Sequence, residues 1–375
     1  MKVIYLASIR FPSERAHSVQ ITHMCNAFAS HGHQVELWVT NRHTQIALSP
    51  EEYYGTTLNF LLERVTVIDL VGKVYLFPHF LGKFIFQFER LQFIIGFIIR
   101  IRKINFNVIY SRDEWLLFFL SFFFTQTSLV YESHEAKYNF AARRILKKGI
   151  RCVCISEGIF NSYKEKGVPV DQMIVAHDGV DDSFFSEHIS KKEAQEKLGI
   201  VQERPVAMYI GGFDQWKGVE TFFKASELLP EVQFVAIGGK PHQISRYSSA
   251  YPRVLFLGSR PYKELVFHQR AADVLVIPNT LRNDLSAKYT SPLKLFAHMT
   301  SGVPMVVSNI PSIQSVLSSE ESFFFRADDQ ENLSEIIQKV IHDPEMAQKK
   351  AKAALEISKK YTWKARAENI LAFIM

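Results

Sequence analysis

The chain has 375 residues, more than one hydrophobic core usually organises, so two domains are expected. A composition of 47% hydrophobic and 22% charged residues is typical of a globular protein and excludes an intrinsically disordered chain. The formal net charge of +6 suits nucleic acid, an anionic membrane surface or a phosphorylated substrate. No nucleic-acid-binding motif appears along the chain, so nucleic acid is not expected as a partner.

The first half of the chain alternates short β-branched runs with helical patterns, as parallel α/β sheets do. A helix is expected over 17–31, where apolar residues recur at helical spacing and Gly32 follows as a stop. Strands are expected at residues 2–7, 34–39, 65–68, 108–110, 128–132, 152–155 and 173–176. The first of these runs soon meets Arg10, so it is interpreted as a strand and not as a signal peptide.

A second, similar alternation follows a polar connector at 182–190. Its expected strands are 206–209, 232–237, 254–257, 274–277 and 305–307, and its expected helices are 218–229, 262–270, 292–299, 332–341 and 344–360. We therefore expect an α/β protein with a Rossmann-like N-terminal domain over 1–183, a Rossmann-like C-terminal domain over 184–358, and a last helix over 359–375 that crosses back to the first domain. Ligands of such sheets bind at the carboxyl ends of the strands.

The three cysteines give neither a disulfide framework nor metal-ligand spacing, because Cys152 and Cys154 alternate within an expected strand. Buried thiols in a reducing cytoplasm are the plain interpretation. A cytoplasmic protein without a metal site is therefore expected.

Residues 75–124 combine unusual aromatic density with basic residues. The phenylalanines there are Phe80, Phe84, Phe86, Phe88, Phe93 and Phe97, followed by those between 118 and 124. Lys83, Arg90 and Arg100 interrupt the segment, so no membrane-spanning run develops. The segment predicts a peripheral contact with anionic lipid at the inner face of the membrane, or alternatively the ordinary core of a large α/β domain.

A candidate phosphate site follows the strand at 206–209. Gly211 and Gly212 come directly after this strand, and Lys217 and Gly218 open the next helix. Backbone amides at a helix start and a lysine directed to the same place are typical of phosphate binding. An ordinary turn between a strand and a helix is the alternative.

A second candidate phosphate contact is the hydroxyl-rich turn Thr290, Ser291, Pro292, Leu293 and Lys294. Proline early in a helix leaves several amides free to face an anion. Serine and threonine are favoured at helix starts regardless of function, so a simple cap is the alternative.

In the first half, Glu132 and His134 end a strand and lie on the same face by the period of two. Arg112 ends the preceding strand and is expected near them. At the start of the first helix, Arg15 and Ser18 are candidates for contact with an acceptor or a diphosphate. A core histidine and a plain helix start are the respective alternatives.

The order of these motifs resembles retaining glycosyltransferases of family 4, within glycosyl transferases group 1. The resemblance implies a GT-B fold, in which two Rossmann-like domains face an interdomain cleft. It further implies transfer of a hexose, without a cofactor, from a nucleoside diphosphate sugar to a glycan, lipid-linked or other cell-surface acceptor. By the same resemblance Lys217 neutralises the leaving diphosphate, while Glu132 and His134 act at the transferred sugar as catalytic residues.

Three positions depart from the family pattern. Ala297 stands where a glutamate holds the ribose, Gly212 where many members have an arginine, and Ser315 where a further glutamate is usual. Tyr289 replaces the first motif glutamate, as in a subset of the family with the Thr-Ser-Pro-Leu-Lys form. A second hypothesis is therefore a catalytically impaired protein that acts as a partner or stabilising subunit of an active transferase. A sugar-nucleotide epimerase is a third, less favoured by the motif order.

Overall fold

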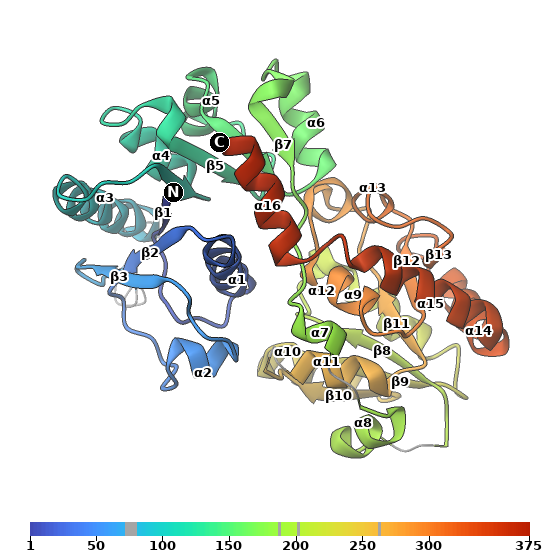
Figure 1. Ribbon diagram of the computed structural model, residues 1–375. Coiled ribbons are helices and arrows are strands. Elements are labelled where there is room, and N and C mark those ends of the chain that lie inside the picture. Colours follow the sequence, from blue (N-terminus) through green and yellow to red (C-terminus); the bar gives the residue numbers. More distant parts are fainter. Residues whose placement is uncertain (72–80, 187–188, 201–202, 262–263) are drawn as a thin grey trace. The chain divides into compact units, whose positions relative to one another are not determined.

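The computed structural model describes residues 1–71, 81–186, 189–200, 203–261 and 264–375 (Figure 1). Within these, the chain forms two compact units. Unit 1 comprises Met1–Ile155, Ile159–Ala176 and Trp363–Met375, and unit 2 comprises Ser156–Gly158 and His177–Thr362. The change between the units falls at Ala176 and His177, not at 183 and 184 as expected, and the return to unit 1 falls at Trp363, not at 359.

Unit 1 is built on a seven-stranded sheet with the order β3-β2-β1-β4-β5-β6-β7. Every neighbouring pair is parallel. The central strands are buried along nearly their whole length, as expected for a sheet covered on both faces. The strands are β1 (Lys2–Ala7), β2 (Gln34–Thr40), β3 (Leu61–Val65), β4 (Val108–Ser111), β5 (Leu129–Ser133), β6 (Arg151–Cys154) and β7 (Met173–Val175).

Helices connect and cover this sheet. They are α1 (Ala16–Ser30), α2 (Pro50–Tyr54), α3 (Gly82–Ile101), α4 (Glu114–Leu120), α5 (Phe140–Lys147), α6 (Glu157–Glu165) and α16 (Trp363–Ile374). The terminal helix α16 packs against α1, and Trp363 stacks on His23 with ring centroids 5.8 Å apart. The last residues of the chain therefore complete the core of unit 1.

Unit 2 is built on a six-stranded parallel sheet with the order β10-β9-β8-β11-β12-β13. Alternate residues enter two different core clusters. Met208 and Ile210 of β8 belong to one, whereas Ala207 and Tyr209 belong to the other, so both faces are buried. The strands are β8 (Val206–Ile210), β9 (Gln233–Ile237), β10 (Val254–Gly258), β11 (Val274–Ile277), β12 (Met305–Ser308) and β13 (Phe323–Phe325).

The helices of unit 2 lie on both sides of this sheet, and α14 packs against α9 while α15 packs against α12. They are α7 (Ser183–Ser186), α8 (Lys191–Leu198), α9 (Val219–Ala225), α10 (Pro241–Ala250), α11 (Leu265–His268), α12 (Leu293–Met299), α13 (Pro311–Gln314), α14 (Gln330–His342) and α15 (Pro344–Ser358). In both units the strand order reverses beside the first strand, at β1/β4 and at β8/β11. These are the switch points where doubly wound sheets bind ligands.

The expected strands are present within one residue of their expected bounds, with one exception, whereas the helix expected at 218–229 already ends at Ala225 and α11 covers only Leu265–His268 of the helix expected at 262–270. The strand expected at 65–68 is wrong, because β3 ends at Val65 and starts at Leu61, with the charged Glu63 and Arg64 inside it. Charged residues are tolerated there because β3 is an edge strand. The strand β13 was not anticipated. The predictions for Tyr75 and Phe80 and the expected helix start at Tyr262 lie outside the described residues.

Candidate functional site

Phosphate-binding candidates gather at the switch point of unit 2. Gly211 follows β8 directly, and the backbone then turns through Asp214 and Lys217 into α9. Gly218 holds the turn in a left-handed conformation with φ of 66°. A Cβ atom there would lie 2.0 Å from the carbonyl oxygen of Pro278, just after β11, so only glycine fits. The close approach of the loop after β8 to the loop after β11 explains why a glycine stands at position 218.

Gly212 leaves room for the ammonium group of Lys217. A Cβ atom built on Gly212 would lie 2.8 Å from Nζ of Lys217. The same Nζ forms an ion pair of 3.0 Å with Asp214 and lies 5.1 Å from the ring centroid of Trp216. Lys217 thus occupies space beside the position where many family members are expected to have an arginine.

Lys294, the second residue of α12, has an enclosed ammonium group. Its Nζ lies 4.7 Å from the ring centroid of Tyr209 and has no hydrogen-bond partner in the described part of the chain. Burial, followed by repulsion from Lys217, lowers the pKa of Lys294 well below its usual value. A buried cation without a partner is costly for the folded protein, so this group is suited to receive an anion.

The rest of the predicted turn is partly structural. The hydroxyl of Ser291 accepts a hydrogen bond of 2.9 Å from the amide of Asp178, and the amide of Thr290 is bonded to the carbonyl of Leu285. Pro292 caps α12, and Leu293 is its first residue. The structure therefore brings Lys294 and Lys217 together, while Thr290 and Ser291 hold the turn in place.

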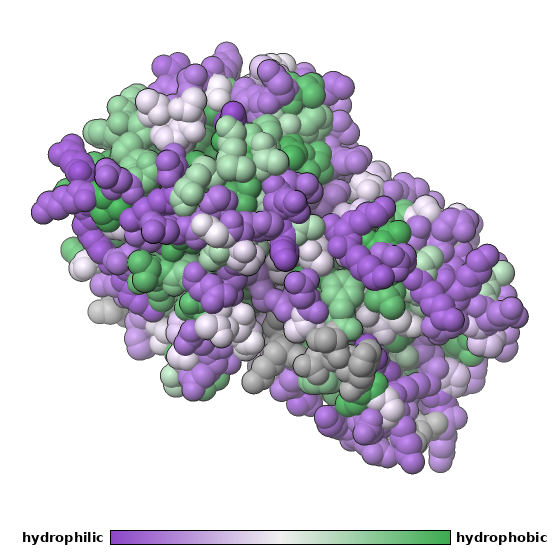
Figure 2. Space-filling model, viewed as in Figure 1, coloured by the Kyte–Doolittle hydropathy of each residue, from purple (hydrophilic) through white to green (hydrophobic). Residues whose placement is uncertain are grey.

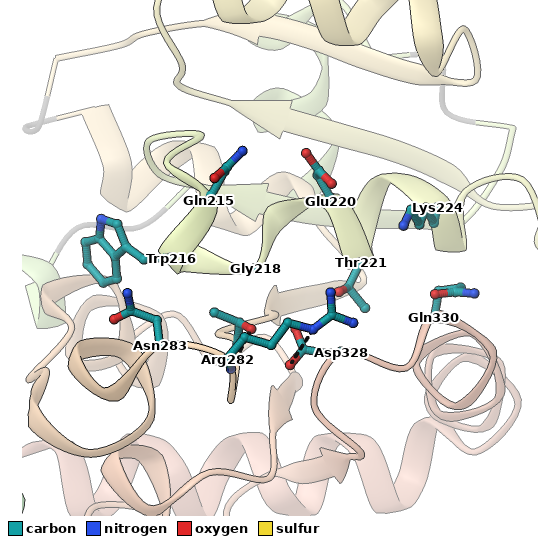
Figure 3. Close-up of a pocket in the computed structure, with 11 residues that line it drawn as sticks. Gln215, Trp216, Gly218, Glu220, Thr221, Lys224, Arg282, Asn283, Asp328 and Gln330 are labelled. Carbon is teal, nitrogen blue, oxygen red and sulfur yellow. Dashed lines mark hydrogen bonds and ion pairs between the residues drawn. The ribbon is translucent and has the colours of Figure 1, made fainter.

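A cavity of about 430 Å³ opens beside this loop (Figure 3). Trp216 and Gly218, which flank Lys217, line it, but neither Lys217 nor Lys294 is among its lining residues. Its other polar lining residues were not predicted from the sequence; they are Gln215, Glu220, Thr221, Lys224, Thr280, Arg282, Asn283, Asp328 and Gln330. The position of 280–283 directly after β11 was the available signal, because this loop leaves the switch point.

Two of the departures from the family pattern, Ala297 and Ser315, lie in different surroundings. Ala297 is fully buried in the core cluster that also holds Met208 and Ile277. Ser315 is half-buried, and its hydroxyl donates a hydrogen bond of 3.1 Å to the carbonyl oxygen of Ser312. Neither side chain supplies a carboxylate to the site.

In unit 1, Glu132 is the centre of a buried polar network. It accepts hydrogen bonds from Gln20 at 2.6 Å and from His134 at 2.5 Å, and also from the hydroxyl of Tyr110. Arg366 of α16 forms an ion pair with it at 3.2 Å. Burial alone would raise the pKa of Glu132, but Arg366 and the hydrogen bond from His134 outweigh it and hold this pKa far below its usual value.

Glu132 is therefore not placed to touch a substrate, and its expected catalytic role is corrected to a positioning role. Its side chain is 0% exposed and its carboxylate is surrounded by donors. His134 is 16% exposed and lines a cavity of about 250 Å³ with Arg112, at the switch point between β1 and β4. Burial, followed by repulsion from Arg112, lowers the pKa of His134 to about 3, so its imidazole is neutral at physiological pH.

The remaining acceptor-side candidates fall in different places. Arg112 lines the same cavity and donates a hydrogen bond of 2.9 Å to the side-chain oxygen of Gln20. Gln20 in turn donates a hydrogen bond to Glu132. Arg15 is exposed and lines a neighbouring cavity. Ser18 is fully buried, with its hydroxyl 3.0 Å from that of Ser13, so its expected contact with the acceptor is wrong and it shapes the loop instead.

Residues 190–356 match the model of the family described as glycosyl transferases group 1. The match contains Lys217, Lys294 and the cavity beside them, and it agrees with the resemblance to glycosyl transferases group 1. A sulfoquinovosyl transferase of Arabidopsis thaliana is 26% identical over 207 residues, which cover 53% of this chain and 39% of that protein.

A D-inositol 3-phosphate glycosyltransferase of Corynebacterium diphtheriae is 24% identical over 220 residues, covering 53% of this chain and 49% of that protein. The chain thus spans about half or less of the length of these two relatives of the group 1 domain.

Solved structures extend the likeness to the whole chain. Sucrose-phosphate synthase of Thermosynechococcus elongatus superposes with a TM-score of 0.75 at 18% identity, covering 99% of this chain and 97% of that one. Anabaena HepE, solved with UDP-glucose, gives a TM-score of 0.73 at 15% identity, covering 99% and 98%. These likenesses confirm the expected GT-B fold, which contains two Rossmann-like units. The residues matched by the group 1 model lie in unit 2.

Proposed function

We propose that the protein is a retaining glycosyltransferase that moves a hexose from a nucleoside diphosphate sugar to a glycan, lipid-linked or other cell-surface acceptor. The observation that carries this proposal is the pair of ammonium groups of Lys217 and Lys294 at the switch point of unit 2, one of them enclosed and unpartnered in the described chain. A diphosphate is the ligand that such a pair fits, because it carries negative charge on several oxygens.

In this mechanism Lys217 and Lys294 bind the diphosphate and stabilise the negative charge that grows on it as the glycosidic bond breaks. Such charges act strongly because they are in place before the reaction and are shielded from water. Retention of configuration is proposed from the family resemblance. The UDP-glucose bound to Anabaena HepE supports a nucleotide sugar as the donor class.

Unit 1 supplies the acceptor side in this proposal. His134 and Arg112 line its cavity and contact the hydroxyls of the sugar or acceptor, while Glu132 fixes the orientation of His134. Because Glu132 accepts from Nε2, the neutral imidazole is left with Nδ1 as an acceptor for a substrate hydroxyl.

The test is a screen of nucleoside diphosphate sugars by thermal shift and by donor hydrolysis. We expect one donor to raise the melting temperature of the wild type and to be hydrolysed, and we expect Lys217→Ala to abolish both effects. Lys339→Ala, an exposed lysine of α14, is the matched control and leaves both unchanged. Turnover that survives in Lys217→Ala contradicts the assigned role of this lysine.

The second candidate, an impaired partner of an active transferase, is favoured by Ala297, which cannot accept a hydrogen bond from a ribose. A charge-assisted bond of this kind is worth about 1.5 to 3 kcal/mol. If no donor binds the wild type but Ala297→Glu restores binding, the second candidate replaces the first. If the wild type turns over a donor, the second candidate is wrong.

We also propose peripheral membrane binding through α3. Its exposed apolar residues recur along one face, while Arg100, Arg102 and Lys103 are exposed at its end. The face consists of Phe84, Phe88, Leu91, Ile95 and Ile99. Figure 2 shows hydrophobic residues interspersed with hydrophilic ones over the visible part of unit 1. Such a combination binds anionic lipid without crossing the bilayer. Among the described residues, no helix combines the length and apolarity needed for a membrane span.

Co-sedimentation with liposomes tests this surface. We expect binding to vesicles that contain an anionic lipid and none to neutral vesicles. The double variant Phe88→Ser, Ile95→Ser is expected to lose binding, whereas Leu48→Ser, which removes another exposed apolar side chain of unit 1, is expected to keep it. Wild-type protein that stays in the supernatant with anionic vesicles contradicts the proposal.

A further inference from the structure

A cavity of about 500 Å³ in unit 1 is lined by arginines that come from different elements. It lies at the carboxyl end of β1 and shares Ser8, His17 and Arg90 with the cavity that holds His134. The arginines on its wall are Arg10 after β1, Arg15 before α1, Arg42 after β2 and Arg90 on α3. Separate parts of the fold therefore bring positive charge to one place.

Arg42 is buried although its guanidinium is not fully paired. Its side chain is only 9% exposed, and its Nε pairs with the buried Glu89. Its Nη2 is enclosed and has no hydrogen-bond partner in the described part of the chain. The guanidinium also lies 5.4 Å from the ring centroid of Phe86, which fixes its plane. An enclosed donor without an acceptor costs free energy that a ligand oxygen would recover.

The arginines are close enough to repel one another. Burial, followed by repulsion from Arg15, Arg10 and Arg90, lowers the pKa of Arg42 to about 10, although Asp69 opposes the shift. Burial and repulsion from Arg112 and Arg15 likewise lower the pKa of His17 to about 4. These shifts reflect arginine side chains that lie near one another around the cavity.

Carboxylates also lie at this cavity: Asp69 lines it, and Glu89 pairs with Arg42. Asp113 is engaged by Arg90 at 3.0 Å and caps α4 through the amides of Trp115 and Leu116. Glu14 pairs with Arg10 at 2.7 Å. Arg15 has no carboxylate partner among the described residues, which leaves its guanidinium available.

We propose that this cavity binds a phosphate group of the acceptor, so that the sugar is transferred to a phosphorylated molecule. That the phosphorylated molecule is an acceptor rests on the proposed glycosyltransferase function. Binding of phosphate to the cavity does not depend on that function. Arg15 and the free Nη2 of Arg42 would hold the phosphate oxygens. Guanidinium groups from several directions suit the tetrahedral oxygens of phosphate better than the planar pair of a carboxylate.

The experiment is calorimetric titration with glycerol 3-phosphate as the probe, with lactate as the carboxylate arm and glycerol as the uncharged arm. The protein is the Lys217→Ala variant, so that the proposed diphosphate site of unit 2 does not contribute. We expect glycerol 3-phosphate to bind and lactate and glycerol not to bind. Arg15→Gln should weaken this binding at least about tenfold.

Two further variants separate binding from folding. Arg42→Lys keeps a cation beside Glu89 but removes the Nη2 donor, and it is expected to weaken binding while a cooperative thermal transition shows that the protein is folded. Arg143→Gln on α5, an exposed arginine outside the lining of the cavity, is expected to bind as the parent does.

Absence of saturable glycerol 3-phosphate binding, equal binding of lactate, or binding that Arg15→Gln leaves unchanged would overturn the inference. If Arg15→Gln in the otherwise wild-type protein instead weakens only the nucleotide sugar, the cavity serves the donor and the inference is wrong. Absence of donor turnover would count against the proposed function alone, because the titration needs no reaction.

Discussion

Lys294 precedes Ala297 by three residues on α12, and its enclosed ammonium group lies against the ring of Tyr209 without a hydrogen-bond partner in the described chain. Side chains three residues apart on a helix are neighbours. A glutamate at 297 would therefore lie beside Lys294 and compete for its charge.

Replacing Lys294 by methionine should stabilise the free protein and weaken donor binding. The substitution removes an enclosed amino group that has no hydrogen-bond partner in the described chain and keeps a similar apolar volume, so the melting temperature should rise. Affinity for UDP or the nucleotide identified in the donor screen should fall at least about tenfold. Thermal denaturation and calorimetry measure the two effects, with Lys339→Met as the control. A lower melting temperature with unchanged affinity would show a purely structural lysine.

Donor binding should take up a proton at Lys294. Burial and the ammonium of Lys217 lower the pKa of Lys294 in the free protein, and a bound diphosphate would raise it again. Affinity should therefore fall as the pH rises from the depressed pKa of the free protein toward the usual value of 10.5. Titrations in buffers of different ionisation enthalpy measure this uptake. It should vanish in Lys294→Met, and equal heats in all buffers for the wild type would contradict it.

The sequence predicted local features well because their signals are local. The period of two placed Glu132 and His134 on one face of a strand, and their side chains are indeed 2.5 Å apart. Gly218 and Lys217 could be predicted at the start of a helix because glycine after a strand marks a tight turn.

The partners that give these residues their roles come from far along the chain. Arg366 reaches Glu132 across 234 positions, and Gln20 across 112, so no spacing rule connects them. For the same reason the sequence suggested that Glu132 would touch substrate, whereas its neighbours enclose it. The arginines of this cavity were also missed as a group, since they come from three separate parts of the chain: the loop between β1 and α1, the segment after β2, and α3.

Gly218→Ala should lower the free energy of unfolding through backbone strain and through a steric clash. The same substitution at Gly302 measures the backbone strain alone. At φ of 66° a Cβ atom is strained, and here it would also lie 2.0 Å from the carbonyl oxygen of Pro278. Gly302 has φ of 70°, but a Cβ atom added there would meet no described atom within 4 Å, so Gly302→Ala has only the conformational cost of about 1 to 2 kcal/mol. Denaturant unfolding should show the larger loss for Gly218→Ala, together with weakened donor binding. Equal losses would mean that the loop after β11 moves aside freely.

His134 should stay neutral across the physiological range. Burial and Arg112 lower its pKa to about 3, despite the opposing effect of Glu132. In the unfolded chain its pKa is near 6.5, so this residue makes the protein less stable as the pH falls from about 6.5 toward 3. Nuclear magnetic resonance of labelled histidine should show no titration of His134 between pH 5 and 8. A midpoint near 6.5 would contradict the buried network.

Glu132→Gln should destabilise unit 1 strongly, because Arg366 would keep a buried charge without its partner. Removing one member of a buried ion pair costs about 3 to 5 kcal/mol. The pKa of Glu132 is held below its usual value of 4.5, so its stabilising effect is present above that pH and is lost as the pH falls toward the depressed pKa. The wild type should therefore lose stability on acidification over this range more steeply than Glu132→Gln does. Denaturant unfolding at several pH values measures both, and the exposed Glu165→Gln of α6 is the control, with an effect below about 0.5 kcal/mol. A loss at neutral pH no greater than that of the control would show that Arg366 finds another partner or water.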